Sequence, residues 1–191
     1  YSKDIGKPIF NYQKDIQKLI PFDYNGDGYD DLLLAYEDGE IRMLENEISN
    51  KRFRDKGTII NLTNGIFSLT KIDVNNDSYD DLVVGTKESC NADEQCLSLF
   101  TNNKGTLEME SLELNLSYKK AYEMKADDMD SDGCEDLVIS DSSGKISIFY
   151  NNSDGDSCKG LSKNAGYSKN YGFNLLDLVN LADQLFVSYA G

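Results

Sequence analysis

An acidic loop runs directly into an apolar strand in the stretch Asp23-Tyr24-Asn25-Gly26-Asp27-Gly28-Tyr29-Asp30-Asp31-Leu32. The pattern returns as Asp73-Val74-Asn75-Asn76-Asp77-Ser78-Tyr79-Asp80-Asp81-Leu82 and again as Asp128-Met129-Asp130-Ser131-Asp132-Gly133-Cys134-Glu135-Asp136-Leu137. We name these stretches loop 1, loop 2 and loop 3, and we number the positions of each loop from its first Asp. Three copies of one loop indicate a repeat protein.

Each loop carries the kind of oxygen atoms that bind a hard cation. Side-chain oxygens occupy positions 1, 3, 5 and 9, and the backbone carbonyl of position 7 can join them. Position 6 is Gly28, Ser78 or Gly133, and glycine permits the sharp turn that brings position 9 back toward position 1. Such a set of oxygens suits Ca²⁺ far better than a transition metal. The alternative is a solvated Asn/Asp turn between strands.

The loops are not EF-hands, although their first six positions look alike. An EF-hand needs a Glu at position 12 and a helix on each side. Here position 12 is Leu34, Val84 or Ile139, each inside an apolar run. The sequence therefore predicts a unit of strand, loop and strand.

The repeat has a period of 50 and then 55 residues, counted between the first Asp residues of the loops. In each period the apolar strand after the loop is followed by a third strand, and a weaker fourth strand is expected near 58–62 and 112–116. Four short strands in about 50 residues are typical of a β-propeller blade. A β-sandwich is the alternative, but it would not explain a loop at the same place in every unit.

We therefore expect an all-β chain that forms part of a larger β-propeller, with three recognisable blades and a partial one. The expected segments are a fourth-type strand at about 8–12, blades at about 16–62, 66–116 and 121–170, and a partial blade at 174–189. The last repeat has a shortened loop with Gln184 at position 9, so no calcium is expected there. A closed four-bladed ring with a defective last blade is the alternative.

The composition excludes some classes of partner. The chain has 34 acidic and 19 basic residues and a net charge of −15, which argues against nucleic acid. Three bound Ca²⁺ would reduce this charge to −9. No apolar run approaches the ~18 residues of a membrane span. The chain opens with Tyr1 and no signal-peptide pattern, which indicates a processed or excised piece.

The four cysteines allow three pairings and have no metal-site spacing. We favour Cys90 with Cys96, which flank an acidic loop tip, and Cys134 with Cys158, which lie at strand ends of the third repeat. These bonds imply an oxidising compartment, so the segment is expected to be secreted or on the extracellular or luminal side of a membrane protein. Four reduced cysteines in a cytosolic protein are the alternative.

Three N-glycosylation sequons begin at Asn61, Asn115 and Asn151. About two such sequons are expected by chance in a chain of this composition, so their number decides little. The first two fall at equivalent points, just before a strand that leads to a loop.

The three loops resemble the calcium motif of FG-GAP (VCBS-like) repeats, which occur in the integrin alpha-subunit propeller and in the T-cell immunomodulatory protein family. The resemblance spans roughly residues 8–189, although Ser78 replaces the usual Gly and the Phe-Gly and Gly-Ala-Pro signatures are absent or worn. It implies three calcium sites. Their ligands would be Asp23, Asn25, Asp27, the Tyr29 carbonyl and Asp31; Asp73, Asn75, Asp77, the Tyr79 carbonyl and Asp81; and Asp128, Asp130, Asp132, the Cys134 carbonyl and Asp136.

The function expected first is a secreted or cell-surface module for protein interaction or adhesion, in which calcium is structural. Its partner would be another protein or the remainder of its own propeller. A carbohydrate-binding propeller is one alternative, because 12 Tyr could stack on glycans, although there is no Trp. A non-catalytic domain of an extracellular enzyme is another. We expect no enzymatic activity, because the chain has no His and its dense carboxylate groups lie in the loops.

Overall fold

The computed structural model describes residues 13–86, 97–110, 112–116, 121–141, 144–155, 157–170, 175–181 and 184–189. These residues form antiparallel β-sheets and one short 3₁₀ helix, η1 (Ile48–Asn50). The prediction of an all-β fold is confirmed.

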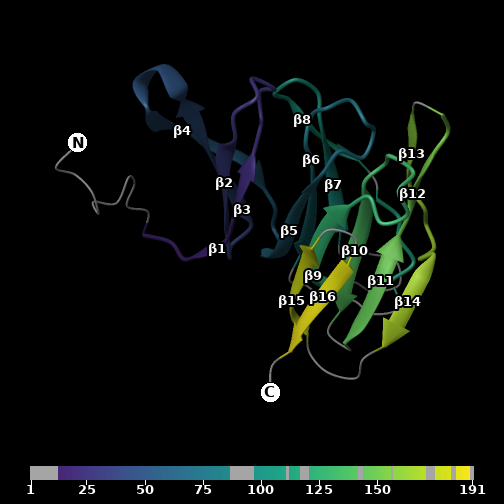
Figure 1. The fold of residues 1–191 in the computed structure, drawn as a ribbon. Helices are drawn as coiled ribbons and strands as arrows, with labels where there is room; N and C mark the ends of the chain where they lie inside the picture. Colours follow the sequence, from purple (N-terminus) through teal and green to yellow (C-terminus); the bar gives the residue numbers. More distant parts are fainter. Residues whose placement is uncertain are drawn as a thin grey trace.

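Three four-stranded sheets follow one another along the chain (Figure 1). Sheet 1 contains β1 (Ile16–Phe22), β2 (Asp31–Tyr36), β3 (Glu40–Glu47) and β4 (Arg52–Asn61). Sheet 2 contains β5 (Ile66–Ile72), β6 (Asp81–Thr86), β7 (Leu97–Asn102) and β8 (Leu107–Glu110). Sheet 3 contains β9 (Ala121–Asp127), β10 (Asp136–Asp141), β11 (Lys145–Phe149) and β14 (Tyr167–Asn170). Each sheet is a meander, which is the arrangement of a propeller blade.

Two hairpins accompany the three sheets. The strands β12 (Asn151–Ser153) and β13 (Cys158–Leu161) pair with each other between the third and fourth strands of sheet 3. The strands β15 (Leu175–Leu181) and β16 (Gln184–Tyr189) form a two-stranded sheet at the C-terminal end of the described residues. In Figure 1 this last hairpin lies beside sheet 3.

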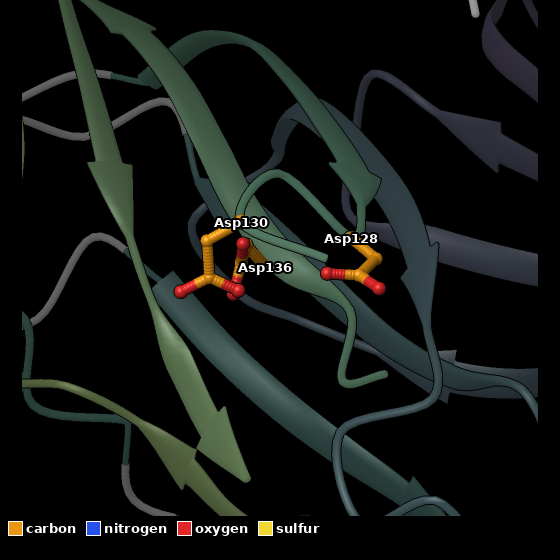
Figure 2. Close-up of side chains that lie close together, drawn as sticks. All are labelled: Asp128, Asp130 and Asp136. Atoms are coloured by element: carbon orange, nitrogen blue, oxygen red, sulfur yellow. The ribbon is translucent and has the colours of Figure 1, made fainter. Parts of the chain in front are cut away.

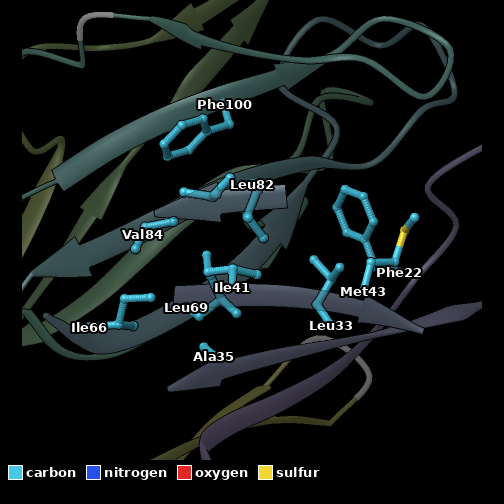
Figure 3. Packing of buried hydrophobic residues seen from close by; sticks show 11 residues of the cluster. Phe22, Leu33, Ala35, Ile41, Met43, Ile66, Leu69, Leu82, Val84 and Phe100 are labelled. Atoms are coloured by element: carbon cyan, nitrogen blue, oxygen red, sulfur yellow. The ribbon is translucent and has the colours of Figure 1, made fainter. Parts of the chain in front are cut away.

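The sheets pack face to face through two apolar cores. Figure 3 shows the first core, in which Leu33 and Ile41 of sheet 1 meet Leu82 and Val84 of sheet 2. On the opposite face of sheet 2, Val83 joins the core shared with sheet 3. Strand β6 is therefore buried on both faces, which explains why it is apolar at consecutive positions rather than at alternate ones.

The first strands of the sheets lie next to one another. Strand β5 contacts both β1 and β9, and β15 contacts β9. Lys18 of β1 also reaches past β5 to form a 2.6 Å ion pair with the buried carboxylate of Glu123 on β9. The loops that leave these first strands are therefore brought to neighbouring positions.

One strand lies elsewhere than the sequence predicted. The fourth strand of sheet 2 is β8, at residues 107–110, and residues 112–116 are not in a strand. The cause is a tight turn, closed by two hydrogen bonds between the backbones of Asn103 and Thr106, which returns the chain to β7 at once. Leu112 and the next alternate leucines pack instead into the core between sheets 2 and 3.

Two further predictions concern residues outside the part of the chain that the structure describes. They are the fourth-type strand at about 8–12 and the Cys90–Cys96 bond. Within the described residues, no helix is long and apolar enough to span a membrane.

Candidate metal centre

All three loops make the same connection, from the first strand of a sheet to the second. Loop 1 joins β1 to β2, loop 2 joins β5 to β6, and loop 3 joins β9 to β10. Because the three sheets share one topology, the loops emerge at equivalent ends of neighbouring sheets.

The carboxylate at position 1 folds each loop around itself. In loop 3, Asp128 Oδ1 accepts a hydrogen bond from the backbone N–H of Asp132 at 3.1 Å, and Oδ2 accepts one from Gly133 at 2.9 Å. Asp23 and Asp73 accept the same two bonds, at 2.9 to 3.2 Å. Position 1 therefore fixes the backbone of positions 5 and 6 from within.

Two positions of each loop have a left-handed backbone. Position 6 has φ of +83° at Gly28, +68° at Ser78 and +91° at Gly133. Ser78 thus adopts the backbone that glycine takes at the equivalent positions. Sequence reasoning missed position 4, where Gly26, Asn76 and Ser131 have φ of +70°, +58° and +63°. Loop 2 is the only one of the three without glycine at either position, so it carries the most backbone strain.

The carboxylates at position 9 are buried and bind backbone on both sides. Asp31, Asp81 and Asp136 are at most 1% exposed. In each, Oδ1 accepts the N–H of an Asn within two residues of the end of the third strand, at 2.7 to 2.9 Å, and Oδ2 accepts the N–H of loop position 2, at 2.9 to 3.3 Å. Position 9 therefore joins its own loop to the third strand of its sheet.

Burial changes the acidity of these groups. Loss of solvent raises the pKa of Asp81 and of Asp136 from 3.8 to about 6, despite the opposing effect of the two backbone hydrogen bonds that each accepts. It also raises the pKa of Asp31. Neighbouring loop carboxylates add to the rise in all three. A cation beside these groups would reverse the effect, because it favours the ionised form.

Loop 3 brings three carboxylates together. Asp128, Asp130 and Asp136 each place an oxygen within 4.8 Å of the others (Figure 2). Within the described residues, this is the one such group of three His, Cys, Asp or Glu side chains. Figure 2 shows the carboxylates of Asp130 and Asp136 close together, with that of Asp128 facing them. Loops 1 and 2 have Asn25 and Asn75 at position 3, so they offer an amide oxygen there.

Not every predicted ligand joins this group. Asp132 Oδ2 accepts a 2.6 Å hydrogen bond from the backbone of Ser153 in β12, and Oδ1 accepts one from Cys134. In loops 1 and 2 the position-5 carboxylates of Asp27 and Asp77 likewise accept the N–H of Tyr29 and Tyr79 at position 7. Asn25 and Asn75 each accept the N–H of position 5. Each of these oxygens keeps a further lone pair that is able to bind a cation.

A disulfide ties loop 3 to the hairpin of sheet 3. Cys134 and Cys158 are bonded, with 5.8 Å between their Cα atoms, as predicted. The bond joins loop position 7 to the first residue of β13. It acts together with the Asp132–Ser153 hydrogen bond to hold loop 3 against this hairpin.

The sequons lie in three different environments. Asn61 is exposed at the end of β4, and the Asn115 side-chain nitrogen donates a 2.6 Å hydrogen bond to Asn164 Oδ1. Asn151 is 0% exposed, and its side-chain nitrogen donates a 2.8 Å bond to the backbone carbonyl of Val74. Glycosylation at Asn151 stays a prediction that this packing does not favour, because the nitrogen that would carry a glycan is enclosed and hydrogen-bonded.

Sequence reasoning also missed the asparagines that close the third strands. Asn46, Asn102 and Asn151 donate their backbone N–H to the position-9 carboxylate of their own sheet. A signal was present, since an Asn follows position 9 by 15, 21 and 15 residues in the three repeats.

The chemistry of the centre is uniform. The atoms available to bind a cation are carboxylate, amide and carbonyl oxygens, a set that fits a hard cation such as Ca²⁺.

The comparisons with known proteins support the repeat pattern. No curated protein matches the chain. The FG-GAP-like repeat family matches residues 23–84, from the start of loop 1 to the strand that follows loop 2. This segment is similar to FG-GAP-like repeats.

Proposed function

We propose that the protein is a calcium-binding interaction module, built as part of a β-propeller whose loops are clamped by Ca²⁺. The observation that carries the proposal is the convergence of Asp128, Asp130 and Asp136 in loop 3. Three carboxylates held within 4.8 Å of one another repel unless a cation or protons neutralise them. Calcium would supply that positive charge, and loops 1 and 2 would hold it with an Asn in place of one Asp.

The bound ions would have a structural role. The position-1 and position-9 carboxylates already organise the loop backbone through hydrogen bonds. A cation between them would hold both ends of the loop and leave the sheets as a rigid support for recognition. The carboxylates are therefore proposed as ligands rather than as catalytic acids or bases.

The partner is proposed to be a protein, or the remainder of the same propeller. FG-GAP-like repeats suggest a module for protein interaction or adhesion. We also propose that the module is related to the integrin alpha-subunit propeller and to the T-cell immunomodulatory protein family. The Cys134–Cys158 bond favours an extracellular or luminal location.

A glycan is the second candidate ligand, and one feature favours it. A groove of about 830 Å³ lies between sheet 2 and the β12–β13 hairpin. Its lining includes Asp77, Glu108, Glu110, Lys159 and Lys163, so its rim offers both acceptors and donors to a polar ligand. A glycan array probed in the presence of Ca²⁺ separates the two: specific binding would favour the glycan, and its absence the protein partner.

Equilibrium dialysis tests the proposed function directly. The protein is stripped of metal with EDTA, dialysed against millimolar CaCl₂ and analysed for bound metal. We expect three Ca²⁺ for each chain. A chain that retains no Ca²⁺ above the buffer background would refute the proposal. A matched variant, Asp130→Ala, should retain one ion fewer.

A further inference from the structure

We propose that Asn102 and Asn151 connect the three loops in series, so that calcium binding to one loop raises the calcium affinity of its neighbour. The inference rests on the proposed function and adds a role for two residues outside the loops. Each Asn is a positioning residue, because it acts on the ligands of two successive loops rather than on the metal itself.

Asn151 joins loop 3 to loop 2. Its backbone N–H donates a 2.9 Å hydrogen bond to Asp136 Oδ1, at position 9 of loop 3. Its side-chain nitrogen donates a 2.8 Å bond to the carbonyl of Val74, at position 2 of loop 2. The residue is 0% exposed, so solvent does not compete for either bond.

Asn102 joins loop 2 to loop 1 in the same way. Its backbone N–H donates a 2.7 Å bond to Asp81 Oδ1, and its side-chain nitrogen donates a 3.1 Å bond to the carbonyl of Tyr24. It is 1% exposed. The same pair of contacts thus occurs at both junctions between sheets.

The two junctions share residues and form one path. Position 2 of a loop accepts the Asn side chain through its carbonyl and donates its own N–H to position 9 of the same loop, as Tyr24 does to Asp31 and Val74 does to Asp81. The hydrogen-bonded path runs through Asp31, Tyr24, Asn102, Asp81, Val74, Asn151 and Asp136. Three candidate ligands therefore lie on one chain of hydrogen bonds, most of whose members are buried.

Direct contacts between the loops accompany this path. Glu135 of loop 3 accepts a 2.7 Å hydrogen bond from the backbone of Asp73, the first residue of loop 2. Lys71 lies 2.8 Å from Asp80 of loop 2 and 4.0 Å from Asp30 of loop 1. Ordering of the backbone of one loop therefore affects the next loop through more than one contact.

The physical basis is the cost of leaving a buried polar group without a partner. If the position-2 peptide of one loop is disordered, the Asn side chain loses its acceptor in a site that water does not enter. Calcium that orders one loop fixes this peptide and, through the Asn, the position-9 carboxylate of the next loop. The second ion then binds a loop that is already partly ordered, which is positive coupling.

The chain supplies a matched control in Asn46. Its backbone N–H makes the equivalent bond to Asp31, at 2.7 Å, but its side-chain nitrogen donates to the carbonyl of Asp30 within the same loop. Removing this side chain deletes an amide at the equivalent place without breaking a contact between loops.

The test follows each loop separately by NMR during a calcium titration. The amides of Gly28, Ser78 and Gly133 are the reporters, because each donates a 2.9 Å hydrogen bond to the position-1 carboxylate of its loop. Asp130→Ala disables loop 3. Asp130 is exposed and accepts no hydrogen bond from the described residues, so the loop backbone should be little disturbed.

We expect Asp130→Ala to raise the calcium concentration for half-saturation at Ser78 by about fivefold or more. The rise should disappear in an Asn151→Ala background and persist in an Asn46→Ala background. If Asp130→Ala leaves the midpoint at Ser78 unchanged while Ser78 still titrates, the coupling is refuted and the calcium proposal stands. If none of the three amides responds to Ca²⁺, the proposed function fails. If Asn151→Ala does not fold, the comparison of Asp130→Ala with the unsubstituted protein still decides between these outcomes.

Discussion

The ring of Tyr79 in loop 2 lies so close to Gly26 in loop 1 that a Cβ at position 26 would overlap its Cε1 atom. Gly28, two residues later, has open space at the same point. Both glycines have a left-handed backbone, which costs an alanine about 1–2 kcal/mol. We expect Gly28→Ala to lower the free energy of unfolding by about this amount and Gly26→Ala to lower it further. Urea denaturation measures both, and the two losses should become equal in a Tyr79→Ser background.

Ser78 carries strain that glycine would relieve. Its φ of +68° is sparsely populated by L-residues, whereas glycine adopts it freely at some entropic cost. Ser78→Gly should therefore raise the free energy of unfolding by up to about 1 kcal/mol. The control is Ser98→Gly in strand β7, which should lower it. A loss at position 78 as large as that at position 98 would contradict the strain.

The three loops should not bind calcium equally. Loop 3 has four carboxylates at positions 1, 3, 5 and 9, whereas loops 1 and 2 have three. Loop 2 also carries the greatest strain, so it should be the weakest site. Asp128→Ala should therefore remove more calcium-dependent stability than Asp73→Ala, measured as the difference between melts in Ca²⁺ and in EDTA. Both substitutions also remove backbone hydrogen bonds that the position-1 carboxylate accepts. The melts in EDTA measure this calcium-independent loss of stability, so that it can be subtracted. The reverse order would refute the ranking.

Calcium affinity should fall in mild acid. In the calcium-free protein, burial raises the pKa of Asp81 and Asp136 to about 6, above the 3.8 of the unfolded chain. Their contribution to calcium-free stability is therefore greatest below pH 4 and is lost as the pH rises through 6. Calcium binds the ionised form, so its affinity has the opposite dependence. We expect the calcium affinity of each of these two sites to fall about tenfold between pH 7.5 and pH 5. At pH 5, one unit below a pKa of about 6, only about one tenth of each carboxylate is ionised. Calorimetric titration at the two pH values measures it, and equal affinities would show that these carboxylates are not ligands.

Local sequence patterns predicted the parts of the fold that depend on neighbouring residues. The spacing of Asp, Asn and Gly predicted the loops because their hydrogen bonds span only two to seven residues, as between Asp128 and Gly133. The apolar runs predicted β2, β6 and β10 because a strand buried on both faces is apolar at consecutive positions, as at residues 137–139 of β10. The disulfide between Cys134 and Cys158 followed from the expectation that both lie at strand ends in one repeat.

Contacts between repeats were not predictable in this way. The roles of Asn102 and Asn151 depend on carbonyls 78 and 77 residues away, and a sequon pattern suggested a surface position for Asn151 that packing excludes. The β12–β13 hairpin also went unnoticed, because its three- and four-residue strands are too short to show a hydrophobic period. Its pairing draws Asp132 toward Ser153 and away from the other carboxylates.

The central claim is that Ca²⁺ binds the loops and stabilises the fold. Thermal unfolding in EDTA and in about 10 mM Ca²⁺ tests it most directly. Sites of the extracellular type bind at about 10⁻⁴–10⁻³ M, and ligand at a hundredfold excess over the dissociation constant adds about 2.7 kcal/mol per site. Mg²⁺ at the same concentration is the control for ionic strength. The account predicts a midpoint several degrees higher in Ca²⁺ than in EDTA or Mg²⁺. Identical midpoints in all three solutions would contradict it.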